Sequence, residues 1–476
     1  MTMERCVGLT ILPEYIQTEG IDGILKSLKR AGATAVSTSP YVMEPATAET
    51  GSREPPGDAK KGVVRLLDRP LWGQNALYVR TEPSWEHDLS FYHGLRYQPD
   101  PVGELTRREG HLVAEFVDAA KKAGFKVYFQ IMAAIPPAYR VQFCSLTEND
   151  MPRLPDGSLP KVRIDKNGSL ASPNLIAYEN AFIRDLCKAY PDIDGFRVDW
   201  PEYPPYTLDG VFLDFSDHAA RAAERLGFDF ERMRRDVGAF RDTLLGGLTD
   251  AMLTDVLEDD GGRYRIFQTI SARPGIADWL CFKSTLSTEL LQGFRQTITA
   301  AAGSDTELIA QAFPAPFSTL SGLSPHRLSG VVDSIQPKFY TMHWPTILKF
   351  YGDTIMNANP GLSEVLLVKV LVRFMDIADD GGLQRLTNYH YPEPDDNHPV
   401  GTGAIARKIR QARFEAGTVP ITALAHGYGP LADVGARLEA AWNASGGRVW
   451  MNRYCYLTDE KLDQIKVITS RTPVVG

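Results

Sequence analysis

The chain has 476 residues, of which 43% are hydrophobic and 23% are charged, and its 40 glycines and 32 prolines are typical of a folded protein with many turns. A formal net charge of -8 without a dense basic cluster argues against nucleic acid and anionic membranes as partners. No apolar run reaches the roughly 18 residues that a membrane-spanning helix needs.

The start of the chain, MTMERCVGLTIL, enters an apolar strand almost at once and lacks the basic segment and cleavage site of a secretory signal. We therefore expect a cytoplasmic protein. Five cysteines are scattered without a C-x-x-C pair, which indicates reduced thiols and not a disulfide framework.

Short segments rich in Val, Ile and aromatic residues recur along the chain and are predicted to be strands. Several follow a glycine at which a helical pattern stops, as in KAGFKV and SGGRVW. The eight predicted strands are Val7–Leu12, Thr34–Ser39, Lys126–Met132, Gly195–Trp200, Glu307–Phe313, Asp333–Thr341, Ile421–His426 and Arg448–Tyr454.

Between these strands, segments such as EGHLVAEFVDAAKKAG and DVGARLEAAWNAS carry apolar residues at helical spacing. Eight βα units predict the α/β class and a closed (β/α)8 TIM barrel. The alternative is an open doubly wound sheet, but the segment after the first strand, ILPEYI, has no glycine-rich phosphate fingerprint.

Three insertions are too long for simple βα loops, at about 41–108, 201–279 and 343–419. They follow predicted strands two, four and six, so in a barrel all three lie on the catalytic face. No solenoid repeat or low-complexity linker interrupts the chain, which predicts one domain over residues 1–476.

The fourth predicted strand reads GFRVDW and is followed by PEYPPY. Side chains alternate along a strand, so Arg197 and Asp199 face one way while Phe196 and Val198 face the other. We expect Arg197 and Asp199 to point into the barrel mouth, where the guanidinium keeps the carboxyl ionised by lowering its pKa.

Glu202 follows the strand among prolines and aromatic residues, and apolar neighbours there would raise its pKa toward that of a general acid. An ionised carboxylate beside a protonated one is what glycosidic-bond cleavage requires. The structural alternative is that Arg197 and Asp199 form a buried ion pair while Glu202 is a solvated loop residue.

The segment DGFRVDW resembles strand four of the α-amylase superfamily, in which an Arg two residues before an Asp accompanies the catalytic nucleophile. That resemblance implies a nucleophile at Asp199, with Arg197 as its partner. The whole chain resembles glycosidase-like TIM-barrel proteins related to the glycoside hydrolase superfamily, with an insertion after strand four that is similar to that of β-galactosidase-type barrels.

The chain departs from these families in three places. An Asn-Glu pair is missing at the end of strand four, strand seven ends in ALAHGYG without a Glu, and strand five ends in IAQAFPAPF without the amylase-type acid. The resemblance therefore implies the fold more firmly than the activity.

Other strand ends supply polar and aromatic side chains of the kind that lines a sugar site. Glu14, after strand one, is the alternative second catalytic carboxylate. The predicted substrate-binding residues are Arg197, Trp200, Tyr203, Gln130, Lys338, Tyr340, His343, Trp344, His426 and Arg453.

We therefore expect a carbohydrate-active enzyme, a glycoside hydrolase with paired carboxylates and no cofactor or metal. One alternative is a metal-dependent sugar isomerase or epimerase, in which Asp199, His343 and His426 meet as ligands. The other is a barrel that binds glycans without catalysis. The oligomeric state stays open, a homo-oligomer being one option.

Overall fold

The computed structural model describes residues 5–54, 68–69, 71–72, 77–140, 144–258 and 261–474. Its centre is a closed barrel of eight parallel strands in which β1 pairs with both β2 and β11. The barrel strands are β1 (Cys6–Thr10), β2 (Ala35–Thr38), β6 (Lys126–Met132), β7 (Gly195–Asp199), β8 (Glu307–Ala312), β9 (Ser334–Phe339), β10 (Ala423–His426) and β11 (Arg448–Asn452). The predicted (β/α)8 barrel is confirmed.

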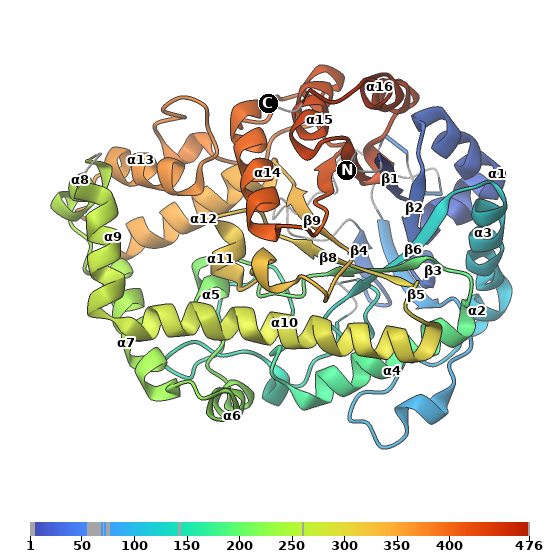
Figure 1. The fold of residues 1–476 in the computed structure, drawn as a ribbon, viewed down its shortest axis with the longest axis horizontal. Helices are drawn as coiled ribbons and strands as arrows, with labels where there is room; N and C mark the ends of the chain where they lie inside the picture. The colour runs from blue at the N-terminus through green and yellow to red at the C-terminus, as the bar shows by residue number, and fades with distance from the viewer. Residues whose placement is uncertain are drawn as a thin grey trace.

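Helices surround this barrel because their apolar faces pack on the outward side chains of the strands. Figure 1 shows the longest of them, α10, running alongside α4. The surrounding helices are α1 (Pro13–Ala31), α3 (His111–Lys122), α4 (Pro173–Ala189), α10 (Pro274–Ala302), α12 (His343–Ala358), α14 (Thr402–Ala416), α15 (Leu431–Ser445) and α16 (Asp459–Thr469).

The connection from β8 to β9, residues 313–333, is built from short helical turns in place of a long helix. Its α-helix, α11 (Phe317–Ser321), is a single turn that follows the segment FPAP and ends at Gly322 in the left-handed conformation. Prolines cannot continue a helix and a glycine with positive φ ends one, so this sequence forms a compact turn.

The insertion after β2 forms a small antiparallel sheet of β3 (Tyr41–Ala46), β5 (Leu77–Pro83) and β4 (Ser52–Glu54), followed by α2 (Glu104–Glu109). The insertion after β7 is helical. It contains α5 (Leu208–Val211), α6 (Asp217–Leu226), α7 (Phe230–Leu244), α8 (Asp250–Leu257) and α9 (Gly261–Ala272).

The insertion after β9 is the one that differs most from expectation. It begins at once with α12, which packs on the barrel, and continues with α13 (Glu364–Met375) before α14. Helix α13 lies against α8, so the second and third insertions touch each other (Figure 1). All three insertions follow the carboxyl ends of their strands, as predicted.

Candidate functional site

Asp199 is the last residue of β7, and its side chain is 15% exposed at the carboxyl end of the barrel. Phe196 and Val198, on the opposite face of β7, are fully buried in the hydrophobic core, which confirms the predicted alternation. The ammonium group of Lys338, from β9, lies 2.5 Å from Asp199 Oδ1. At this distance the two charges attract each other directly.

The ion-pair partner of Asp199 is thus Lys338 and not, as we expected, Arg197. The Arg197 guanidinium is completely buried, donates from Nε to Gln336 Oε1 (2.8 Å), and lies 4.0 Å from the centre of the Trp450 ring. Burial lowers the pKa of Arg197 to about 9, and the charge of Asp199 is among the effects that oppose this shift. Arg197 acts on Asp199 through space from inside the barrel.

Two glutamine amides join these charged groups. Gln130 Nε2 lies 3.5 Å from Asp199 Oδ2. With its amide oriented to suit its neighbours, Gln311 donates to Asp199 Oδ1 (3.3 Å) and accepts from Arg197 Nη2 (3.1 Å). Gln130 was predicted, whereas Gln311 and Gln336 were missed. Both could have been found from the sequence, because each is an amide side chain at an inward position of an otherwise apolar strand.

Lys338 is 2% exposed, and aromatic rings cover it. Its Nζ lies 4.9 Å from the centre of the Phe313 ring and 5.6 Å from that of Trp200. Ring faces attract a cation, and an apolar cover strengthens an ion pair beneath it. Lys338 and Asp199 therefore interact far more strongly than a pair at the surface.

The chain turns sharply directly after Asp199. Trp200 has a φ of +53°, in the left-handed region that a bulky residue rarely occupies. Asn167, in the loop after β6, holds this turn by donating from Nδ2 to the backbone carbonyls of Trp200 and Glu202, both at 2.8 Å. Sequence reasoning missed Asn167, because no local pattern marks its partners.

Glu202 is completely buried. Its carboxylate accepts hydrogen bonds from the backbone N–H of Phe313 (2.8 Å) and from the Ser321 hydroxyl. Burial raises its pKa to about 7, while the charge of Lys338 lowers it. The expected rise in pKa is confirmed. In this conformation, however, the side chain connects the loops after β7 and β8 and has no surface open to a ligand.

Glu14, in the first turn of α1, is also buried and belongs to a separate polar group. It accepts from Arg140 Nη1 (2.8 Å) and from the Tyr41 hydroxyl (2.9 Å). Burial raises its pKa to about 7, and the charge of Arg453 lowers it. The predicted residues Glu14 and Arg453 are thus near enough for their charges to interact.

Tyr340, His343 and His426 lie together at the carboxyl ends of β9 and β10. The Tyr340 ring lies 5.6 Å from His343 and 5.0 Å from His426, centre to centre. The charge of Asp199 adds to burial in raising the pKa of Tyr340. His426 is neutral, because burial lowers its pKa well below 6.5 and its Nδ1 accepts from the backbone N–H of Tyr428 (3.2 Å).

Two aromatic residues that were predicted to bind substrate belong to the core instead. Trp344 is 1% exposed and packs on Phe339, with the Lys408 ammonium 5.3 Å from its ring centre. Tyr203 is completely buried, and its hydroxyl donates to Asp214 Oδ2 (3.0 Å). Each begins an insertion, where a large ring anchors the segment on the barrel.

A metal-ligand set does not form among the residues described. No three His, Cys, Asp or Glu side chains in that part of the chain lie together as they would around an ion. The charged partner of Asp199 is Lys338, and not a metal ion held with His343 and His426 as the isomerase alternative would require.

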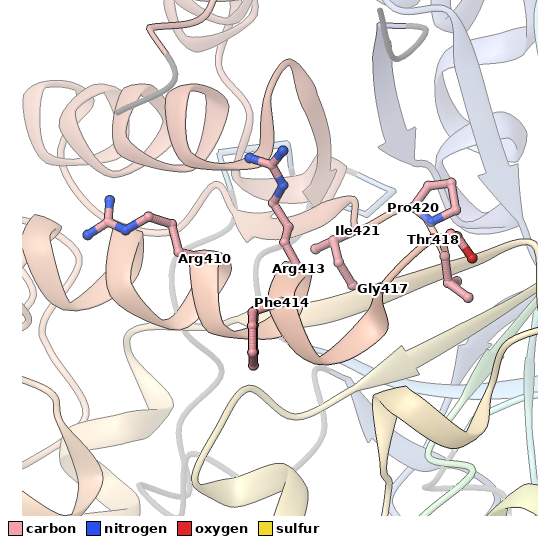
Figure 2. Close-up of a pocket in the computed structure, with 8 residues that line it drawn as sticks. Arg410, Arg413, Phe414, Gly417, Thr418, Pro420 and Ile421 are labelled. Carbon is pink, nitrogen blue, oxygen red and sulfur yellow. The ribbon is translucent and has the colours of Figure 1, made fainter. Parts of the chain in front are cut away.

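A pocket lies at the other end of the barrel, between the end of α14 and the start of β10 (Figure 2). Ile421 in this pocket precedes β10, so the pocket is at the amino ends of the strands, away from Asp199. In the described ranges, we find no helix with the length and hydropathy needed to cross a lipid bilayer.

No protein-family model and no curated protein matches the sequence. Among solved structures, the β-galactosidase of the psychrophilic Marinomonas ef1 matches with a TM-score of 0.51 and 12% identity, over 98% of this chain and 59% of that one. The β-amylase catalytic domain of Paenibacillus polymyxa matches with a TM-score of 0.48 and 8% identity, over 98% and 99% of the two chains.

The chain therefore spans about three fifths of the galactosidase chain that it matches. At 12% identity this likeness concerns the fold, which is a (β/α)8 barrel shared with glycoside hydrolases. The resemblance to glycosidase-like barrels is confirmed at that level. The activity has to be argued from the site.

Proposed function

We propose that the chain hydrolyses a glycosidic bond and that Asp199 is its catalytic carboxylate. The observation that carries this proposal is the Asp199–Lys338 ion pair, which holds a partly exposed carboxylate at the carboxyl end of a barrel strand. Active sites of such barrels lie at this end. The fold shared with a β-galactosidase adds support.

The charge of Asp199 suits the transition state of this reaction, in which positive charge develops on the sugar ring. Lys338 and the amides of Gln130 and Gln311 contact the carboxylate and fix its position before substrate arrives. A preorganised charge of this kind stabilises the transition state without reorganisation cost. Asp199 acts as nucleophile or as base.

Glu202 supplies the second carboxyl group under this proposal. With a pKa of about 7, it retains a proton in much of the population at neutral pH, as a general acid must. Its hydrogen bonds to Phe313 and Ser321 have to open when substrate binds, because the side chain is buried. Glu14, with a similar pKa, is the second choice for this role.

A glycan-binding barrel without catalysis is the second candidate function. It is favoured by the burial of both Glu202 and Glu14, which leaves Asp199 as the partly exposed member of the three predicted carboxylates. Such a protein would use Asp199, Tyr340 and His343 to contact the sugar without cleaving it.

Hydrolysis of a panel of nitrophenyl glycosides and of oligosaccharides tests the proposal. Asp199→Asn keeps an oxygen facing Lys338 and should lower kcat roughly 100-fold to 10000-fold on every substrate. Glu202→Gln should slow oligosaccharides, whose leaving groups need a proton, far more than nitrophenyl glycosides. Asp192→Asn, an exposed control seven residues before Asp199, should change neither.

If Asp199→Asn remains folded and fully active on the substrate that the wild type cleaves, the proposed role of Asp199 is wrong. Glu14→Gln is then the next variant to measure. Sugar binding without hydrolysis of any member of the panel would favour the glycan-binding barrel.

A further inference from the structure

We propose that Lys338 binds the hydroxyl group next to the reacting carbon of an uncharged sugar, so that the substrate is a neutral glycoside with a free hydroxyl at that position. This inference rests on the function proposed above and names its substrate class. It assigns Lys338 a contact with the sugar in addition to its contact with Asp199.

The argument begins with the buried lysines of the described chain, of which there are four: Lys283, Lys338, Lys408 and Lys461. Three of them donate to backbone carbonyls. Lys408 donates to Ala315 and Met375, both at 2.6 Å, and Lys283 and Lys461 likewise reach two carbonyls each. These three ammonium groups are satisfied within the fold.

Lys338 differs from these lysines. In the part of the chain that the structure describes, Asp199 is the polar group in contact with its Nζ, and no backbone carbonyl accepts a hydrogen bond from it. An ammonium group has three donors, and a buried donor without an acceptor costs free energy. The remaining donors of Lys338 are therefore unused within the fold, and an oxygen of a bound ligand can accept from them once the ring of Trp200 or Phe313 over Nζ moves aside.

The position of Lys338 indicates which oxygen this is. Its Nζ lies 2.5 Å from the carboxylate that is proposed to act on the reacting carbon. An oxygen that accepts from Nζ is then close to that carbon, and the hydroxyl on the adjacent ring carbon meets this condition. Hydrogen bonds to this hydroxyl strengthen in the transition state of glycoside hydrolysis.

Charge favours a neutral sugar over an acidic one. The positive charge of Lys338 is already matched by Asp199, so the carboxylate of a uronic acid would meet like charge at short range. Arg197, the next cation, is completely buried and donates to Gln336 and Thr10. It presents no surface to a second anion.

Binding measurements by saturation-transfer NMR and calorimetry test this inference without reference to turnover. The probes are the methyl glycosides of glucose, galactose, mannose and xylose, their 2-deoxy analogues, and methyl glucuronide and galacturonide. We expect at least one neutral glycoside to bind about tenfold or more tightly than its 2-deoxy analogue, as loss of a charged hydrogen bond predicts. The matching uronide should bind more weakly than the neutral sugar.

Lys338→Met should weaken binding of the neutral glycoside at least about tenfold and bring it close to the affinity of the 2-deoxy analogue. Lys122→Met, the same substitution on the exposed face of α3, is the matched control and should leave both affinities unchanged. Thermal unfolding shows whether Lys338→Met is folded. If that variant does not fold, Lys338→Arg takes its place, since arginine retains the charge and the donors.

The inference is overturned if the panel does not bind, if the uronide binds more tightly, or if a 2-deoxy sugar binds as well as its parent. These outcomes are separable from failure of the proposed hydrolase. Selective binding without cleavage removes the hydrolase and keeps this inference, whereas cleavage with equal affinity for 2-deoxy sugars does the reverse.

Discussion

Asp199 and Lys338 form an ion pair although their strands, β7 and β9, are separated by β8. The two side chains differ in exposure, at 15% for Asp199 and 2% for Lys338. Removing one member of a buried ion pair leaves the other charge without compensation, whereas removing both can cost less.

We therefore expect Asp199→Ala to lower the free energy of unfolding by about 3–5 kcal/mol, because the deeper charge of Lys338 is left unpaired. Lys338→Met should cost less, since water reaches the remaining carboxylate. The double variant should lose less stability than the sum of the losses in the two single variants. Urea unfolding at pH 7 measures all three, and strict additivity would contradict the pairing.

The raised pKa of Glu202 predicts how stability depends on pH. A folded-state pKa of about 7, above the ordinary 4.5, means that the folded protein binds this proton more tightly than the unfolded chain. Stability from this group is complete below pH 4.5 and is lost as the pH rises toward 7, by roughly 3 kcal/mol in total.

Glu202→Gln should remove this part of the pH dependence, because the amide does not titrate. The pKa of Glu14 is also raised to about 7, so Glu14 adds its own loss of stability with rising pH, and the variant retains that part. Denaturant unfolding between pH 4.5 and 8 should thus give a shallower decline than the wild type. Glu86→Gln, at an exposed position, is the control. If stability declines with pH in Glu202→Gln as steeply as it does in this control, Glu202 does not have a raised pKa.

Glu179 on α4 should be a site at which substitution stabilises the protein. The side chain is completely buried, its carboxyl oxygens lack a well-formed hydrogen bond to any described residue, and burial raises its pKa well above 4.5. Glu179→Met should raise the free energy of unfolding at pH 7 by about 1–3 kcal/mol.

This gain should shrink as the pH falls, because the folded state holds the Glu179 carboxyl in its protonated form and acid relieves the cost. Melting temperatures at pH 5 and pH 8 measure the difference. Glu115→Met, an exposed control on α3, should shift neither temperature. A loss of stability in Glu179→Met at both pH values would mean that the carboxyl has a polar role.

Asp150 shows the opposite behaviour. It is completely buried, and the donors around its carboxylate are Tyr97, Thr147, Ser172, Asn174 and His218. Although burial opposes the change, these hydrogen bonds lower its pKa from 3.8 to about 2. Its contribution is therefore present above pH 4 and is lost as the pH falls toward 2.

Asp150→Asn should lower the free energy of unfolding by at least about 2 kcal/mol at pH 7, because an amide cannot accept from all of these donors. The difference between variant and wild type should narrow between pH 4 and pH 2. Acid titration followed by circular dichroism measures it, and equal stability at neutral pH would contradict the assigned network.

The barrel could be predicted from the sequence because its strands and helices depend on local patterns. The inward direction of Asp199 follows from alternation along β7 alone. The rise in the pKa of Glu202 followed from its prolines and aromatic neighbours. Each of these inferences uses residues that are close in the chain.

The ionic partner of Asp199 could not be predicted in the same way, since Lys338 lies 139 positions further along the chain and two strands away in the barrel. Arg197 is nearer in sequence, but its guanidinium donates to Gln336 and Thr10 inside the barrel. The exposure of Trp344 and Tyr203 was likewise misjudged, because burial in an insertion depends on segments that pack over it.

The two hydrogen bonds of Asn167 have a consequence for how this protein diverges. One amide after β6 fixes the turn after β7, and Glu202 in that turn fixes the loop after β8 through Ser321. Mutations at these three positions cannot accumulate independently. In homologous sequences we expect Asn167, Glu202 and Ser321 to be exchanged together, so that three successive strand ends are inherited as one block.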